Sequence, residues 1–289
     1  ASWDADELSL YGRFDFILAK DGTPKILEFN ADTPTSLLEA SVIQWQWKED
    51  VFPECDQFNG IHEGLVQSWK DIFPKKGEIY FAGALENNED TGTLQYLAST
   101  AMEAGFSTRV LDMQALDLQN GRFFDPAGEL VNRCFKLYPW EWMVDESPDG
   151  CLAEMEWLEP IWKLVMSNKA ILATLYELFP DSPYVLPCYL SRPRSGLFCK
   201  KPVFSREGHN VSVVDIRNWE EHVRIAETEG DYNTGAYVYQ EYVESTVYSG
   251  RYPVIGSWII GGEAAGIGIR ENRMEVTDNL SEFVPHIIG

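Results

Sequence analysis

The feature that constrains this fold most is a tight turn between two short strands near the start of the sequence. Residues 13–18 (RFDFIL) predict a strand, and residues 25–29 supply a partner strand. Between them lie Asp21 and Gly22, a pair that strongly favours a β-hairpin turn. The sequence therefore predicts an antiparallel hairpin.

One face of this hairpin carries oxygen ligands. Asp15 and Glu28 lie on neighbouring strands at a similar height, and Asn30 shares the face of Glu28 because side chains alternate along a strand. Two carboxylates and an amide oxygen suit magnesium, which binds few protein ligands and adds water and substrate phosphates. Arg13 shares the face of Asp15 and can meet a phosphate. The alternative is a solvated polar face on a half-buried sheet.

Downstream of the hairpin, the pattern predicts helices and strands in alternation. Ser36 and Glu39 have the spacing of a capping box that opens a helix carrying two tryptophans. A strand, a helix and a strand then form a β-α-β unit of a small parallel sheet. The predicted elements are a helix at 61–72, a strand at 78–85, an acidic loop (ENNED), a helix from about 94 to 104, a strand at 108–111, and a helix that starts at Ser167 or Asn168 and ends before Pro180.

From residue 184 onward the pattern changes to strands. They end in a hairpin at 253–269, which turns at two consecutive glycines. One helix is expected among these strands, opened by a capping box of Asn218 and Glu221. Glycine-bounded loops between the strands favour a mobile lobe. The fold class is therefore α/β (α+β).

Composition excludes several classes of protein. The net charge is −23, with 46 acidic and 23 basic residues, which argues against nucleic acid or an anionic membrane as partner. The same charge is compatible with a cationic substrate such as a polyamine. Five scattered cysteines without a CxxC pair argue against zinc and predict reduced thiols in a cytoplasm. No apolar run of about 18 residues exists to span a membrane.

Widely separated cations form a second candidate site. Lys169 lies near a predicted helix start, where backbone donors favour anions. Lys201 precedes a polar loop that contains Arg206 and ends in Gly208, and such a loop can fold over phosphates. For each cation taken alone, a solvated surface position is the alternative.

Two further motifs are weak. Residues 239–243 end an apolar strand, where exposed backbone amides and carbonyls can bind an adenine edge, or the segment is an ordinary strand. Residues 266–268 (GIG) lack a third glycine and a following helix, so a dinucleotide loop is rejected. The four histidines have no metalloprotease or triad context, and Ser257 is not in a nucleophile elbow, which argues against a hydrolase.

Long stretches of the chain resemble one known family. The sequence is similar to the synthetase domain of bacterial glutathionylspermidine synthase, in particular to stand-alone members described as acid–amine ligases. The resemblance covers essentially the whole chain in the same order. The stretches that carry it are YGRFDF…ILEFNADTPTSLLEASVIQWQW (11–47), FKLYPWEWM (135–143), EPIWKLVMSNKAIL (159–172), KPVFSREGHNV (201–211), IGSWIIGGEAAGIGIREN (255–272) and the terminal VPHII.

The resemblance implies an ATP-grasp fold, with a core at 1–75 and 155–289, a lid at about 180–250 and an inserted α/β subdomain at 76–150. It also implies a ligase that joins a glutathione-like carboxylate to a polyamine-like amine with ATP and Mg²⁺, through an acyl phosphate. The implied roles are magnesium binding by Asp15, Glu28 and Asn30; catalysis by Arg13, Arg206 and Arg270; nucleotide binding by Lys169, Lys201, Gln240, Glu241, Tyr242, Glu275, Val276 and Thr277; and substrate binding by Ser36 and Glu89.

The chain also departs from the family. Residues 86–91 (ENNEDT) differ from the usual DxEDR pattern, which affects the specificity for the amine. An N-terminal segment of the stand-alone members is not found in this sequence. The alternative function is an ATP-binding regulatory module without ligase activity, and a magnesium-dependent phosphohydrolase is a weaker third possibility. The sequence defines neither the acid, nor the amine, nor the oligomeric state.

Overall fold

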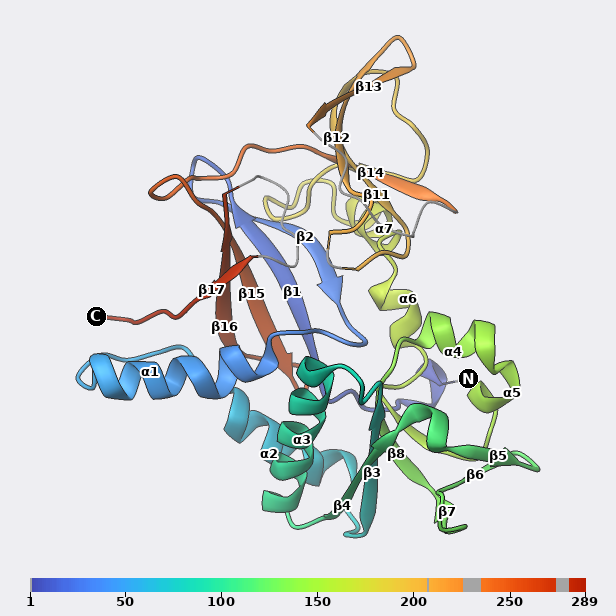
Figure 1. Ribbon diagram of the computed structural model, residues 1–289. Helices are drawn as coiled ribbons and strands as arrows, with labels where there is room; N and C mark the ends of the chain where they lie inside the picture. Colours follow the sequence, from blue (N-terminus) through green and yellow to red (C-terminus); the bar gives the residue numbers. More distant parts are fainter. Residues whose placement is uncertain (1, 207, 226–234, 274–280) are drawn as a thin grey trace.

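The structure is a computed structural model that describes residues 2–206, 208–225, 235–273 and 281–289. Three larger sheets organise the chain (Figure 1). A five-stranded central sheet lies beside a second five-stranded sheet, and a four-stranded parallel sheet with its helices lies at the opposite end of the molecule. Within the described residues, no helix is long and apolar enough to cross a membrane.

The central sheet contains the hairpin predicted at the start of the chain. Its strand order is β17-β16-β15-β1-β2, and every neighbouring pair is antiparallel. Asp15 lies directly opposite Glu28, and a bulge between Asp15 and Phe16 sets this pairing. The second predicted hairpin, at the two glycines, is also confirmed. The strands are β1 (Tyr11–Leu18), β2 (Pro24–Asn30), β15 (Tyr252–Ile260), β16 (Glu263–Asn272) and β17 (Glu282–Val284).

The second sheet has the order β10-β14-β11-β12-β13 and is also antiparallel. The helix predicted from Asn218 and Glu221 is wrong, because this stretch is the hairpin between β12 and β13. Asn218 and Trp219 have φ values of 51° and 71°, and positive φ at both central residues is the geometry of a two-residue hairpin turn. The strands are β10 (Cys188–Tyr189), β11 (Gly196–Pro202), β12 (Ser212–Arg217), β13 (Glu220–Ile225) and β14 (Tyr237–Glu241).

The parallel sheet confirms the predicted β-α-β unit, because β3 and β4 pair in parallel on either side of α3 in the sequence. Only the first part of the acidic stretch predicted as a loop lies outside a helix, because α3 begins at Asn88 with Asn87 as its N-cap residue. Oδ1 of Asn87 accepts the backbone N–H of Glu89, and acidic side chains stabilise a helix N-terminus. The elements are β3 (Glu78–Gly83), α3 (Asn88–Glu103), β4 (Ser107–Asp112), β8 (Arg133–Leu137) and β9 (Glu156–Leu158), beside a small sheet of β5 (Asp117–Gln119), β6 (Arg122–Phe124) and β7 (Leu130–Val131).

The remaining helices pack around these sheets. The helix predicted at 61–72 is present with these bounds, and its Trp69 donates from Nε1 to Oγ1 of Thr100 inside the core. The capping box predicted at Ser36 does not form: its φ of 64° lies outside the extended region of an N-cap residue. The helices are a π-helical turn (Glu39–Ile43), α1 (Gln44–Val51), α2 (Ile61–Ile72), α4 (Trp140–Glu146), α5 (Pro148–Cys151), α6 (Lys163–Ser167) and α7 (Ile171–Leu178), with short 3₁₀ turns at Trp3–Ala5 and Met113–Ala115.

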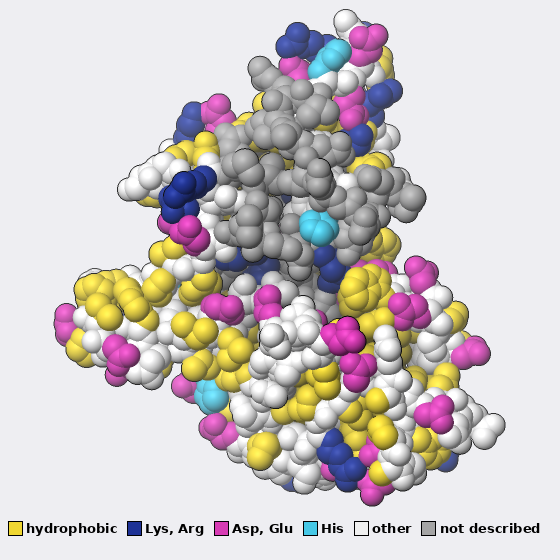
Figure 2. Space-filling model, in the orientation of Figure 1, with side chains coloured by type: hydrophobic (Ala, Val, Ile, Leu, Met, Phe, Trp, Pro, Cys, Tyr) yellow, Lys and Arg dark blue, Asp and Glu magenta, His cyan; other side chains and the backbone are white. Residues whose placement is uncertain are grey.

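Acidic side chains are spread over the face of the molecule shown in Figure 2 and do not gather in one patch. This distribution matches the high net negative charge.

His286 couples stability to pH. Its Nδ1 lies 3.0 Å from Oε1 of Gln44, and its buried Nε2 has no hydrogen-bond partner within the described part of the chain. Burial lowers the pKa of His286 below its ordinary value of 6.5. The folded state therefore binds fewer protons than the unfolded state, and the free energy of unfolding falls as the pH drops below about 6.5 and through the folded pKa.

We therefore expect the wild type to lose stability relative to His286→Gln between about pH 8 and pH 5. Urea unfolding of both proteins across this range measures the difference. A difference that stays constant over the range contradicts the prediction.

Candidate active site

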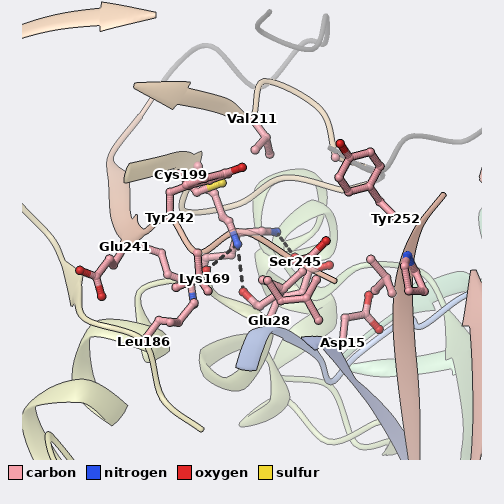
Figure 3. A pocket seen from close by; sticks show the side chains of 18 residues that line it. Asp15, Glu28, Lys169, Leu186, Cys199, Val211, Glu241, Tyr242, Ser245 and Tyr252 are labelled. Carbon is pink, nitrogen blue, oxygen red and sulfur yellow. Dashed lines mark hydrogen bonds and ion pairs between the residues drawn. The ribbon is translucent and has the colours of Figure 1, made fainter. Parts of the chain in front are cut away.

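A cleft lies between the central sheet and the second sheet. The free space in it, with the open mouth included, is about 940 Å³. Figure 3 shows Asp15 and Glu28 at the base of the cleft, with Cys199 and Val211 above them. The apolar part of the wall includes Ile17, Leu27, Leu186, Val211 and Val254.

Two arginines hold Asp15 on β1. Nε and Nη2 of Arg13 donate to its two carboxylate oxygens at 2.6 and 2.9 Å, and Nη2 of Arg270 on β16 donates to Oδ2 at 2.8 Å. Burial lowers the pKa of Arg13, but Asp15 outweighs burial, so this pKa is raised. The charge of Arg13 lowers the pKa of Arg270. Two neighbouring guanidinium groups thus share one carboxylate, and such a pair attracts a further anion.

A glycine makes room for Arg13. Gly256 on β15 lies opposite Asp15, and a Cβ atom at this glycine would lie 2.7 Å from Cδ of Arg13. Any larger residue would therefore displace the arginine. Sequence reasoning did not identify this position, although a glycine inside a strand often marks a close approach of this kind.

Glu28 on β2, the carboxylate opposite Asp15, forms an ion pair with a lysine. Its Oε1 accepts from the amide nitrogen of Asn30 at 3.2 Å, and its Oε2 lies 3.1 Å from Nζ of Lys169. Burial raises the pKa of Glu28, but Lys169 and Lys201 outweigh burial and lower the pKa to about 2. The carboxylate is therefore ionised at neutral pH.

Lys201 on β11 is held by Gln240 on β14. Nζ of Lys201 donates to Oε1 of Gln240 at 2.7 Å and to the carbonyl of Leu27 at 3.0 Å, while Nε2 of Gln240 donates to the carbonyl of Ile26 at 2.8 Å. These bonds fasten the second sheet to the central hairpin. The Gln240 side chain is buried, so it orients Lys201.

The adenine-binding prediction is wrong in one detail. The backbone amides of Glu241 and Tyr242 are not exposed, because they donate to the carbonyls of Pro187 and Leu197 at 2.7 and 3.0 Å. Both residues still line the cleft. Carbonyl groups and side chains remain for contacts with a base.

A second, smaller cavity adjoins the cleft and shares Glu28 and Lys169 with it. The free space in this cavity, with the part open to solvent included, is about 360 Å³. Arg206 lines this cavity and donates to Oγ1 of Thr33 and to the carboxylate of Glu141 on α4. Sequence reasoning missed Glu141, which lies 65 residues from its arginine partner.

The other predicted residues lie elsewhere. Ser36 and Glu89 line neither of these two cavities as described. Glu275, Val276 and Thr277 lie outside the described residues. The structure therefore brings together Arg13, Asp15, Glu28, Asn30, Lys169, Lys201, Gln240 and Arg270 around the cleft, with Arg206 in the adjoining cavity.

The donor set fits a hard cation such as Mg²⁺. Each carboxylate oxygen has two acceptor positions; Oδ1 of Asp15 accepts one hydrogen bond, from Arg13, and the two oxygens of Glu28 each meet one donor. Asn30 also faces both carboxylates, and rotation of its amide presents an oxygen in place of the nitrogen. Among the described residues, no group of three His, Cys, Asp or Glu side chains is arranged to hold a metal ion, so a cation here needs ligands from a bound substrate as well.

Comparison with known proteins places the chain in a family. The model of the family described as "Glutathionylspermidine synthase preATP-grasp" matches residues 1–289. The chain belongs to the glutathionylspermidine synthase family. A protein of Haemophilus influenzae named as an acid–amine ligase is 39% identical, with 99% of this chain and 76% of that protein covered. The bifunctional glutathionylspermidine synthetase/amidase of Escherichia coli is 26% identical over 96% of this chain.

The chain spans about half the length of this bifunctional relative, 49% of it. The names of both relatives describe ligases that form C–N bonds. Among solved structures, the chain is similar to one from Methylobacillus flagellatus described as a γ-glutamylcysteine synthetase, with a TM-score of 0.64 at 9% identity, covering 99% of this chain and 82% of that one. The fold is therefore of the ATP-grasp type, as the sequence resemblance implies.

Proposed function

We propose that the protein is an ATP- and Mg²⁺-dependent ligase that joins the carboxylate of a glutathione-like peptide to a polyamine-like amine. One observation carries the proposal. Four cations and two carboxylates converge at the base of a cleft whose remaining wall is largely apolar. An excess of positive charge inside so acidic a protein suits a triphosphate, and the apolar part suits a base. The converging residues are Arg13, Arg270, Lys169, Lys201, Asp15 and Glu28.

The chemistry of such a ligase assigns a task to each group. The carboxylate oxygen of the acid attacks the γ-phosphorus of ATP, ADP leaves, and an acyl phosphate forms. Nitrogen of the neutral amine then attacks the acyl carbon, the bond to phosphate breaks as the amide forms, and the released phosphate takes up the proton that the nitrogen loses. Lys169 and Lys201 bind phosphate oxygens, and Arg13 stabilises the charge of the transferring phosphoryl group. Magnesium held by Asp15, Glu28 and Asn30 would neutralise phosphate charge.

We place the nucleotide-binding core at residues 1–75 and 155–289, the lid at about 180–250 and the inserted subdomain at 76–150. The strands of the second sheet support the lid assignment, because they lie above the base of the cleft and contribute Lys201. A lid of this kind excludes water from an acyl phosphate. The small molecules that the ligase joins are its proposed partners.

A substrate panel tests the proposal. The protein is mixed with ATP, Mg²⁺, glutathione or γ-glutamyl peptides, and a set of amines, and phosphate release is measured against an Asp15→Ala control. We expect at least one acid–amine pair to raise phosphate release above this control. If no pair does so and calorimetry still detects ATP binding, a regulatory nucleotide-binding module is the better description. ADP formation that needs neither acid nor amine indicates a phosphohydrolase.

A further inference from the structure

The smaller cavity contains polar atoms that the folded chain leaves without partners. Oε2 of Glu141, Oγ of Ser167 and Nε of Arg206 are buried, and none has a hydrogen-bond partner within the residues that the structure describes. All three residues line this cavity. A buried polar atom without a partner costs free energy, so three of them in one cavity indicate groups that meet a ligand.

The cavity opens at the reacting end of the proposed site. Glu28 and Lys169 form a shared wall between it and the nucleotide cleft, and Asn30 also lines it. A molecule in this cavity therefore lies next to the metal-binding and phosphate-binding groups. It does not lie at the apolar end of the cleft.

The free oxygen of Glu141 selects for a donor. An ionised carboxylate only accepts hydrogen bonds. The two cations of the cavity, Lys169 and Arg206, pair with Glu28 and with Oε1 of Glu141, so Oε2 of Glu141 still needs a donor. Arg206 donates from its two terminal nitrogens to Thr33 and Glu141, and its buried Nε has an N–H group without a partner among the described residues, which can meet one oxygen of an acyl group. The cavity thus offers an acceptor for an amino group beside a donor for an acyl oxygen.

The side chain of Glu141 is also held in place. Glu141 follows Trp140, the first residue of α4. The backbone N–H of Trp140 donates to Oδ2 of Asp32 at 2.8 Å. The Trp140 ring donates from Nε1 to the carbonyl of Glu159 at 3.0 Å. Fixed groups bind a ligand with a smaller loss of conformational entropy than mobile ones.

We propose that this cavity is the binding subsite for the amine substrate and that Oε2 of Glu141 accepts a hydrogen bond from its amino group. The proposal rests on the proposed ligase function. It assigns amine recognition to Glu141, whereas the sequence resemblance points to Glu89.

Glu141→Gln is the test, and Glu146→Gln is the matched control. Glu146 lies on the same helix but is exposed and meets Tyr138. Each protein is assayed with ATP, Mg²⁺ and glutathione, once with spermidine and once with hydroxylamine, a small neutral nucleophile that traps an acyl phosphate. In Glu141→Gln we expect the KM for spermidine to rise about tenfold or more, while hydroxylamine-dependent ADP release stays within about twofold of wild type. The control is expected to match the wild type in both assays.

The outcomes separate this inference from the proposed function. Equal losses with spermidine and hydroxylamine, or no change with either, overturn the role of Glu141 even when the ligase is active. An inactive wild type counts against the proposed function, and calorimetry then tests the subsite directly. Spermidine is titrated into the protein loaded with Mg²⁺ and the β,γ-imido analogue of ATP. Affinity reduced about tenfold in Glu141→Gln supports the subsite; equal affinity in both proteins, or no binding to the wild type, overturns it.

Discussion

Glutamine in place of Glu28 is expected to lower magnesium-dependent ATP turnover about 1,000-fold while the chain stays folded. The substitution keeps the shape of the side chain and removes the charge that faces Lys169 and a bound cation. Stabilisation of phosphate charge by a metal contributes several kcal/mol to such a reaction, and about 4 kcal/mol corresponds to three powers of ten in rate. ADP formation with and without Mg²⁺ measures the effect.

Nucleotide binding separates this role from a general loss of structure. Without Glu28, Lys169 and Lys201 lose a counter-charge, so metal-free ATP is expected to bind at least as tightly as to the wild type. Glu244→Gln is a suitable control, because Glu244 pairs with Lys20 on the surface, where ion pairs have small effects. Turnover of Glu28→Gln that is within tenfold of wild type and still depends on Mg²⁺ would contradict the metal-binding role.

The base of the cleft was predictable from sequence because its key contacts are local. A tight turn brings β1 against β2, so Asp15, Glu28 and Asn30 lie near one another, and alternation puts Arg13 beside Asp15. Such arguments need only strand geometry over about 20 residues. A bulge between Asp15 and Phe16, which the sequence did not predict, sets the pairing of Asp15 with Glu28. No comparable local pattern in the sequence predicts contacts between residues that are far apart in the chain.

The long-range contacts show the limit of this reasoning. Arg270 meets Asp15 across 255 positions, and Arg206 meets Glu141 across 65. These contacts depend on how whole sheets pack, and no local spacing encodes that packing. Family resemblance supplied the roles of Arg206 and Arg270, but it did not reveal Glu141 or the buried bond between Lys201 and Gln240.

The predicted elements were wrong where the same side chains fit two different structures equally well. Asn218 followed three positions later by Glu221 fits a capping box, yet asparagine also tolerates the left-handed region that a tight hairpin requires. Pairing of β13 with β12 decides between them, and this pairing is a tertiary property. At Asn87 the opposite error arose, since a polar acidic stretch resembles a loop although a helix begins within it.

A buried ion pair joins the base of the site to the parallel sheet. Nζ of Lys136 on β8 donates to Oδ1 of Asp32 at 2.7 Å, and both side chains are at most 1% exposed. Nζ also donates to the carbonyl of Tyr138 at 2.9 Å and lies 4.3 Å from the centre of the Trp140 ring. Burial lowers the pKa of Lys136, and Asp32 opposes this shift. Asp32 lies two positions after Asn30 and also accepts the backbone N–H of Trp140 in α4, the helix that carries Glu141. The pair thus lies between the metal-binding hairpin and this helix.

Methionine in place of Lys136 is expected to lower the free energy of unfolding by about 3–5 kcal/mol, because it leaves the carboxylate of Asp32 buried without its counter-charge. The double variant Lys136→Met with Asp32→Asn is expected to recover part of this loss, since asparagine still accepts the N–H of Trp140 and carries no charge. Lys20→Met is the surface control, with an expected change below about 1 kcal/mol. Urea unfolding measures all three, and a Lys136→Met protein within about 1 kcal/mol of wild type would contradict the role of this pair.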